Sequence, residues 1–300
     1  MRSFFTLTYA PLFWFGFIGA AVSILQLPSV PDLWLVPLAA LAMAVSFGAE
    51  SLVPYDTQWN LSQGDRRRDV AHTLTNESIN LVGLHFWAFA VAATEFIAPV
   101  RLWPVDLPFP VQLLAAILIC DLGITLMHYA SHRWRPLWRL HAVHHSVGRM
   151  YGFNGLMKHP LHQVVEAAAG FTPLLLLGAS KPVVLGVAFA TVIQLLLQHS
   201  NVDMRLGPLR HLFAFAPVHR FHHLKYGSAG DVNFGFFFCI WDRMLGTTFD
   251  DDTVRVRTRD LGIGSRPSYP MGYWAQLREP FRNQPPEERT EPAPDWLRHP

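Results

Sequence analysis

The sequence HYASHRWRPLWRLHAVHH runs from His128 to His145 and places five histidines within eighteen residues, directly after a long apolar run. His128 and His132 are four residues apart, while His141, His144 and His145 form the pattern His-x-x-His-His. Residues three or four positions apart share one face of a helix, so each group can direct its imidazole rings toward one point. Neutral histidine is the commonest metal ligand in proteins. The stretch therefore predicts a metal site carried by helices.

A second His-x-x-His-His motif occurs far downstream, at His219, His222 and His223. His199 ends an apolar segment in the phrase Gln-His-Ser-Asn and is a further candidate ligand. A single metal ion rarely takes more than about six donors, and zinc usually takes four. So many histidines therefore predict two metal ions. The predicted ligands are His128, His132, His141, His144, His145, His199, His219, His222 and His223.

The remaining histidines carry weaker signals. His159 and His162 are each open to three interpretations: a metal ligand, a hydrogen-bond partner of a ligand, or a polar residue at the membrane interface. Isolated histidines are expected to be ordinary solvated or packed residues; these are His72, His85, His211 and His299. The alternative for the clusters themselves is a set of interfacial histidines on a basic membrane surface, and the repeated spacing argues against it.

Asp121 lies inside an apolar segment, where a carboxylate is costly and normally functional. It precedes His128 by two helical turns and so shares its face. We expect it to accept a hydrogen bond from a ligand ring and to fix the tautomer of that ring. A polar contact between membrane helices is the alternative. Asn233 and Asp242 could act in the same way, or they could cap local turns.

The composition indicates a membrane protein. Hydrophobic residues make up 51% and charged residues 15% of the chain, and the apolar residues are clustered. Four segments are nearly free of charge and, at about 20 residues, are long enough to cross a bilayer. These predicted spans are Pro11–Leu27, Leu33–Val53, Ile79–Ile97 and Val111–Met127, while the shorter Val164–Leu177 and Val183–Gln198 predict a deep hairpin or a pair of full spans. The predicted fold is an all-α polytopic membrane helix bundle, with four spans, a short helical hairpin and a histidine-rich helical cap.

The chain divides into three predicted regions. Residues 1–110 carry the N-terminal spans and a basic loop, and residues 111–249 carry the histidines and the hairpin. Residues 250–300 form a C-terminal cytosolic tail, which is expected to be partly disordered because it becomes rich in proline.

The distribution of basic residues predicts the orientation. If the spans alternate, the loops 28–32, 99–110 and 178–182 lie on one side and contain only Arg101 and Lys181. The other side receives all remaining basic residues and every clustered histidine. Because basic loops face the cytosol, we expect a multi-pass membrane protein with its active site on the cytosolic face.

Two classes of partner or cross-link are disfavoured. Cys120 and Cys239 lie in apolar or aromatic surroundings and predict no disulfide framework. A net charge of +2, with basic residues scattered along the chain, argues against nucleic acid as a partner.

The donor set favours iron. Zinc hydrolases carry a His-Glu-x-x-His helix, which the sequence lacks, whereas imidazole-rich iron with open positions activates dioxygen. A pair of such ions at a bilayer surface suits a lipid substrate. Electrons must come from a separate donor protein, because the chain has no flavin fingerprint, haem-attachment motif or iron–sulfur cysteines.

These motifs resemble the fatty acid hydroxylase / sterol desaturase superfamily of integral-membrane di-iron enzymes. The resemblance covers residues 121–248, including the three histidine groups and the later Asn-Phe-Gly, Trp-Asp and Gly-Thr phrases that begin at Asn233, Trp241 and Gly246. The chain departs from the family at Thr125, where tyrosine is frequent, and at Tyr129, where arginine is frequent. These departures bear on the substrate rather than on the ligands.

The resemblance implies two iron ions, for which zinc can substitute in a purified sample, with dioxygen as co-substrate. It also implies hydroxylation or desaturation of a lipid C–H bond. We favour a hydroxylase acting on an acyl chain or sterol-like lipid, with a desaturase using the same metal site as the alternative. A non-redox metal-binding transporter is a second alternative, which is disfavoured because the ionisable residues gather at one face.

Overall fold

The structure is a computed structural model that describes the backbone of residues 2–97, 102–283 and 288–297, and the side chains of these residues except 84–97. It is helical, and in these ranges β-structure is limited to isolated bridges such as that between Pro54 and Val202. The α-helices are α1 (Arg2–Gln26), α2 (Leu35–Leu52), α3 (Arg66–Ile97), α4 (Phe109–Arg133), α5 (Arg135–His145), α6 (Pro160–Leu176), α7 (Lys181–Gln198), α8 (Ala216–His219), α9 (Ile240–Leu245) and α10 (Tyr273–Arg278). Short 3₁₀-helices connect them, including η1 (Asp32–Trp34), η3 (Gly152–Leu156), η4 (Gly207–His211), η5 (Arg220–His223) and η8 (Glu279–Phe281). The predicted all-α fold is confirmed.

Four helical segments of the described residues are long and apolar enough to cross a membrane. They are Arg2–Gln26, Asp32–Leu52, Phe109–Arg133 and Lys181–Gln198. The last of these is α7, for which the sequence had left open a deep hairpin or a full span. The span expected at Ile79–Ile97 forms the C-terminal part of α3, and its side chains from residue 84 onward lie outside the described residues, so this span stays a prediction. The polytopic helix bundle is confirmed.

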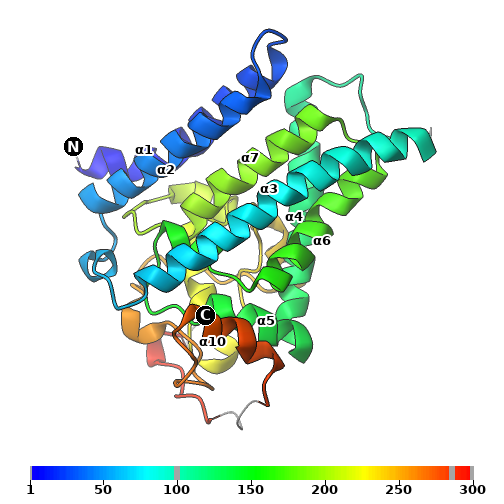
Figure 1. The fold of residues 1–300 in the computed structure, drawn as a ribbon. Coiled ribbons are helices and arrows are strands. Elements are labelled where there is room, and N and C mark those ends of the chain that lie inside the picture. The colour runs from blue at the N-terminus through cyan, green and yellow to red at the C-terminus, as the bar shows by residue number, and fades with distance from the viewer. Residues whose placement is uncertain (1, 98–101, 284–287, 298–300) are drawn as a thin grey trace.

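The α1–α2 and α6–α7 turns lie at the end of the bundle opposite the histidines. Lys181 at the start of α7 forms an ion pair with Asp32, at 2.7 Å, and so joins the α6–α7 turn to the α1–α2 turn. Figure 1 shows α5 and α10 at the other end, beside the histidine-bearing end of α4. The short turns and the histidines therefore lie on opposite sides, as the distribution of basic residues predicts. The assignment of the histidine side to the cytosol stays a prediction.

Close packing between α4 and α6 fixes the position of the histidine-bearing end of α4. A Cβ atom on Gly123 of α4 would lie 2.1 Å from the backbone oxygen of Ala169, and a Cβ atom on Gly170 of α6 would collide with α4 in turn. Small residues let membrane helices approach this closely. The contact holds α4 in place a short distance before His128 and His132.

The region after residue 250 packs against the cap through α10. Gln276 is buried; its side-chain oxygen accepts a hydrogen bond from Nε2 of His72 in α3 at 2.9 Å, and its amide nitrogen donates to the hydroxyl of Ser146 at 3.0 Å. Residues 284–287 and 298–300, in the tail for which partial disorder is expected, lie outside the described residues.

Candidate metal centre

A sharp corner between α4 and α5 brings the first two histidine groups together. Trp134, between the helices, has an extended backbone with φ −116° and ψ 113°. Pro136 lies in the first turn of α5, where its missing N–H costs nothing because that N–H would have no helical partner. The last turn of α4 and the last turn of α5 therefore face each other across the corner.

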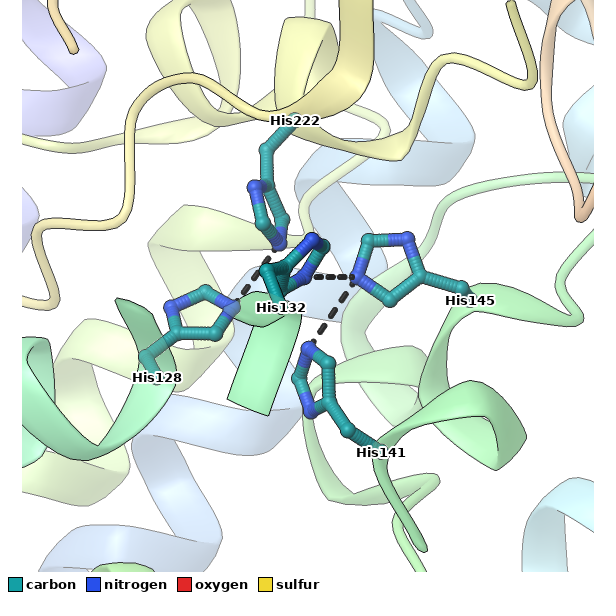
Figure 2. A group of neighbouring side chains, drawn as sticks. All are labelled: His128, His132, His141, His145 and His222. Atoms are coloured by element: carbon teal, nitrogen blue, oxygen red, sulfur yellow. Dashed lines mark hydrogen bonds between the residues drawn. The ribbon is translucent and has the colours of Figure 1, made fainter. Parts of the chain in front are cut away.

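Five of the nine predicted ligands form one group, which we call the five-histidine cluster. Its members are His128, His132, His141, His145 and His222, and their ligand nitrogens lie within 4.8 Å of one another. Figure 2 shows rings from α4, α5 and η5 directed at a common centre. The Nε2 atoms of His128 and His222 are 2.8 Å apart, and Nε2 of His145 lies 3.1 Å from Nε2 of both His132 and His141.

The other four predicted ligands form a second group, the four-histidine cluster. It consists of His144, His199, His219 and His223, all buried, again with nitrogens within 4.8 Å of one another. Nε2 of His144 lies 3.2 Å from Nε2 of His199, and Nε2 of His219 lies 3.2 Å from that of His223. The two clusters are adjacent, since the rings of His145 and His223 stack with centroids 4.8 Å apart. The structure thus brings all nine residues together, in two groups.

Each His-x-x-His-His motif is divided between the clusters. The first and last histidines of the α5 motif, His141 and His145, join the five-histidine cluster, while His144 joins the other. In the second motif His222 is the residue that crosses over. Successive helical residues are about 100° apart, so His144 and His145 cannot point the same way. We expected each group to direct its rings at one point. In the structure each His-x-x-His-His motif instead contributes rings to both clusters.

The hydrogen bonds of two rings indicate that a cation belongs between them. Nδ1 of His128 lies 2.9 Å from the backbone oxygen of Phe234, and Nδ1 of His222 lies 2.8 Å from that of Val232. A carbonyl oxygen only accepts, so each Nδ1 carries the proton and each neutral ring directs a lone pair from Nε2. These lone pairs face each other at 2.8 Å and repel unless a positive ion lies between them. Two nitrogens that share one ion at roughly 2.1 Å and a right angle lie about 3 Å apart, so the cluster fits a metal.

Burial keeps the rings in their metal-binding form. Removal from water lowers the pKa of His144, His145 and His219 well below the ordinary value, and it lowers the pKa of His223 to about 3. Imidazole binds metal only when it is neutral. The folded chain therefore presents these ligands ready for metal at neutral pH.

The metal-free protein is expected to lose stability as the pH falls below 6.5, the ordinary pKa of histidine. In that window the unfolded chain binds protons at its exposed histidines, while the folded chain keeps His223 neutral down to a pH of about 3. The free energy of unfolding then decreases as the pH decreases, because the unfolded state binds more protons. Melting curves of metal-free protein in detergent, recorded from about pH 7.5 to about pH 5, test this linkage. A flat profile would contradict buried neutral rings.

Asp121 anchors a backbone segment instead of a ring. Its buried carboxylate accepts hydrogen bonds from the backbone N–H groups of Phe236, Phe237 and Phe238, at 2.8 to 3.2 Å, and from Nε1 of Trp241 at 2.7 Å. The helical position of Asp121 suggested that it would accept from the ring N–H of His128. The backbone oxygen of Phe234 accepts that N–H instead. We propose that Asp121 supports the centre by holding this segment in place.

Asp231 is a carboxylate that does contact a predicted ligand, and the sequence reasoning missed it. Its Oδ1 accepts from Nδ1 of His132 at 2.9 Å. Asp231 lies 99 positions away along the chain, in a loop where helical spacing gives no information. The only available signal was its place just before the Asn-Phe-Gly phrase that starts at Asn233.

The histidines with weaker sequence signals lie in different surroundings. His162 is buried beside His141, with ring centroids 4.5 Å apart, and its Nε2 lies 2.9 Å from the hydroxyl of Ser131. His159 instead caps α6 through the N–H of Leu161. His72 is buried in the α3–α10 contact and His211 is exposed, whereas the side chain of His85 and residue His299 lie outside the described residues.

The fold and the site define a polytopic membrane protein with a buried, histidine-rich centre suited to metal. A sequence model of the fatty acid hydroxylase family matches residues 113–247. The ornithine lipid hydroxylase OlsE of Rhizobium tropici is 35% identical over 257 residues, which cover 83% of this chain and 76% of that protein. The alkylglycerol monooxygenase of Danio rerio is 30% identical over 168 residues, covering 55% of this chain and 37% of that protein.

A third relative, the very-long-chain aldehyde decarbonylase GL1-9 of Oryza sativa subsp. indica, is 27% identical over 159 residues, or 52% of this chain and 60% of the relative. No solved structure matches the chain. The chain belongs to the fatty acid hydroxylase family, as its motifs predicted. It is an oxidoreductase, as the sequence also predicted.

Proposed function

We propose that the protein is a di-iron, dioxygen-dependent hydroxylase that inserts oxygen into an unactivated C–H bond of a membrane lipid. The observation that carries the proposal is the pair of adjacent clusters in which buried Nε2 atoms face each other 2.8 to 3.2 Å apart. Two of the relatives are named a lipid hydroxylase and a monooxygenase, which favours hydroxylation over desaturation. The three relatives described above are all named as enzymes, which argues against the transporter alternative.

The nine histidines would hold the two ions, five in one cluster and four in the other. Iron in such a site supplies the oxidising power needed to remove hydrogen from an unactivated carbon. The chain's own contribution is to keep the rings neutral, to orient four of them by hydrogen bonds at Nδ1, and to exclude bulk water from the buried centre. His128, for example, is oriented by the carbonyl oxygen of Phe234.

A lipid substrate is supported by the position of the centre on a membrane helix. His128 and His132 lie in the last two turns of α4, a candidate membrane span. Leu122 and Leu126, a short distance before them, expose 37% and 47% of their surface and form part of the apolar outer face of this helix. A lipid chain moving along that face would come close to the ligands without leaving the hydrocarbon. The ornithine lipid hydroxylase among the relatives makes an acylated amino-acid lipid the first substrate to examine.

A separate electron-donor protein is part of the proposal. The chain has two cysteines, Cys120 and Cys239, and both are free and buried. Two cysteines are too few to hold an iron–sulfur cluster by four thiolates. We further propose that the centre faces the cytosol, because the basic residues gather on its side of the bundle.

The proposal is tested by comparing total lipid extracts of cells with and without the protein by mass spectrometry. A hydroxylase yields a lipid class heavier by one oxygen atom, and fragmentation of that species identifies the altered chain. A class lighter by two hydrogen atoms would establish the desaturase alternative instead. Unchanged lipids in cells that contain iron-loaded protein and a competent donor would contradict both.

A further inference from the structure

The short segment Asp231–Phe234 contacts three ligand rings of the five-histidine cluster. The carboxylate of Asp231 binds His132, as described above, and the carbonyl groups of Val232 and Phe234 accept from two more Nδ1–H groups. The three rings come from two different elements, α4 and η5. One loop therefore sets the tautomer and direction of three of the five rings.

The segment is itself held firmly. Asn233 has a left-handed backbone, with φ 53°, a conformation that asparagine tolerates better than most residues. Its buried amide donates to the carbonyl oxygens of Val218 and Phe249, at 2.9 and 2.7 Å, and accepts from the N–H of Phe249 at 2.9 Å. Asp242 accepts the N–H of Phe234 at 2.7 Å. A fixed loop can orient the rings without bending toward them.

The four-histidine cluster has no comparable support in the described part of the chain. Nδ1 of His144 lies 3.3 Å from the carbonyl oxygen of Met157. The Nδ1 atoms of His219 and His223 are buried without a hydrogen-bond partner, as is that of His141 in the five-histidine cluster. One loop thus holds three of the five rings in that cluster, and no single described segment does the same for the other four. The two clusters thus differ in how well their rings are oriented.

We propose that the segment Asp231–Phe234 makes the five-histidine cluster the tighter of two metal sites, with Asp231 as its principal positioning residue. The inference rests on the proposed two-ion centre. A hydrogen bond to the far nitrogen of a ligand ring fixes its tautomer and strengthens its donor atom, and losing one costs about 10- to 100-fold in metal affinity. Asp231 contributes most because its acceptor is a charged carboxylate, whereas the other two acceptors are neutral carbonyl groups. A guanidinium nitrogen of Arg133 lies 3.7 Å from this carboxylate.

The test measures the metal retained per chain when the full-length protein, loaded with Co²⁺, is equilibrated with increasing concentrations of a chelator. The parent protein should release its ions in two steps of one ion each. In Asp231→Ala the later step should move to about 10- to 100-fold lower chelator concentration while the earlier step stays in place. Asp231→Asn keeps an acceptor oxygen without the charge and should give an intermediate shift.

Two further variants assign the steps. Asp106→Ala, which removes an exposed carboxylate near the opposite end of α4, should leave both steps unchanged. His199→Ala removes a ligand of the four-histidine cluster and should abolish the earlier step alone. Release of both ions together from the parent protein would overturn the proposal. A shift of both release steps by the same amount in Asp231→Ala and in Asp231→Asn would also overturn it. Binding of fewer than two ions by the parent protein would overturn the two-ion centre itself, so the two failures are distinguishable.

Discussion

His222→Ala is expected to abolish lipid hydroxylation and to lower the metal content of the purified protein. His222 is fully buried, and its Nε2 lies 2.8 Å from that of His128 in the five-histidine cluster. Removing a partner of a ligand already costs about 10- to 100-fold, so removal of the ligand itself should lower activity by more than about 100-fold. Metal analysis and lipid mass spectrometry on the same preparations measure both effects.

Two comparison variants separate ligand loss from unfolding. His222→Gln retains most of the side-chain volume and should fold like the parent protein while still losing activity. His211→Ala changes an exposed histidine of η4 and should retain both metal and activity. Full activity in folded His222→Ala would show that this residue is not a ligand.

Asp121→Ala is expected to prevent accumulation of folded protein. The carboxylate is buried and accepts three backbone N–H groups and the Trp241 indole N–H. Each buried donor left without a partner costs about 1 to 3 kcal/mol, and the total is comparable with the 5 to 15 kcal/mol that typically stabilises a domain. Size-exclusion profiles and melting temperatures in detergent measure the loss.

Thr125→Val provides the matched control for Asp121. The Thr125 hydroxyl donates to Asp121 at 3.3 Å and lies 3.3 Å from the N–H of Phe236, so its removal disturbs the same network at its margin. It should lower the melting temperature far less than Asp121→Ala does. If Asp121→Ala folded as stably as the parent protein and yet lost activity, Asp121 would take part in the chemistry rather than in support.

Helical periodicity is the reason that much of the site could be predicted from the sequence. The spacing of His128 and His132 places them on one face of α4, and this is a local property of the chain. The long apolar runs likewise identify the helices, although α7 begins at Lys181 and not at the predicted Val183, because the apolar pattern does not extend to its charged first residue.

Two features could not be predicted, because they depend on contacts between distant segments. Helical spacing separates His144 from His145, but the partners that His144 meets depend on where the second cluster lies relative to α5, which the motif does not report. The carboxylate that binds a ring, Asp231, lies in a loop, whereas Asp121 had the favourable helical position and proves to bind the backbone of residues 236–238. In both cases tertiary packing decides which polar groups meet.

The central claim is that two redox-active ions are held by nine histidines, and iron content measured together with oxygen uptake tests it most directly. Protein purified from iron-replete cells should contain two iron atoms per chain, and oxygen consumption in the presence of a reductant should rise when the lipid substrate is added. A chain that folds with one iron atom or none under these conditions, or that binds two without substrate-dependent oxygen consumption, would contradict the account.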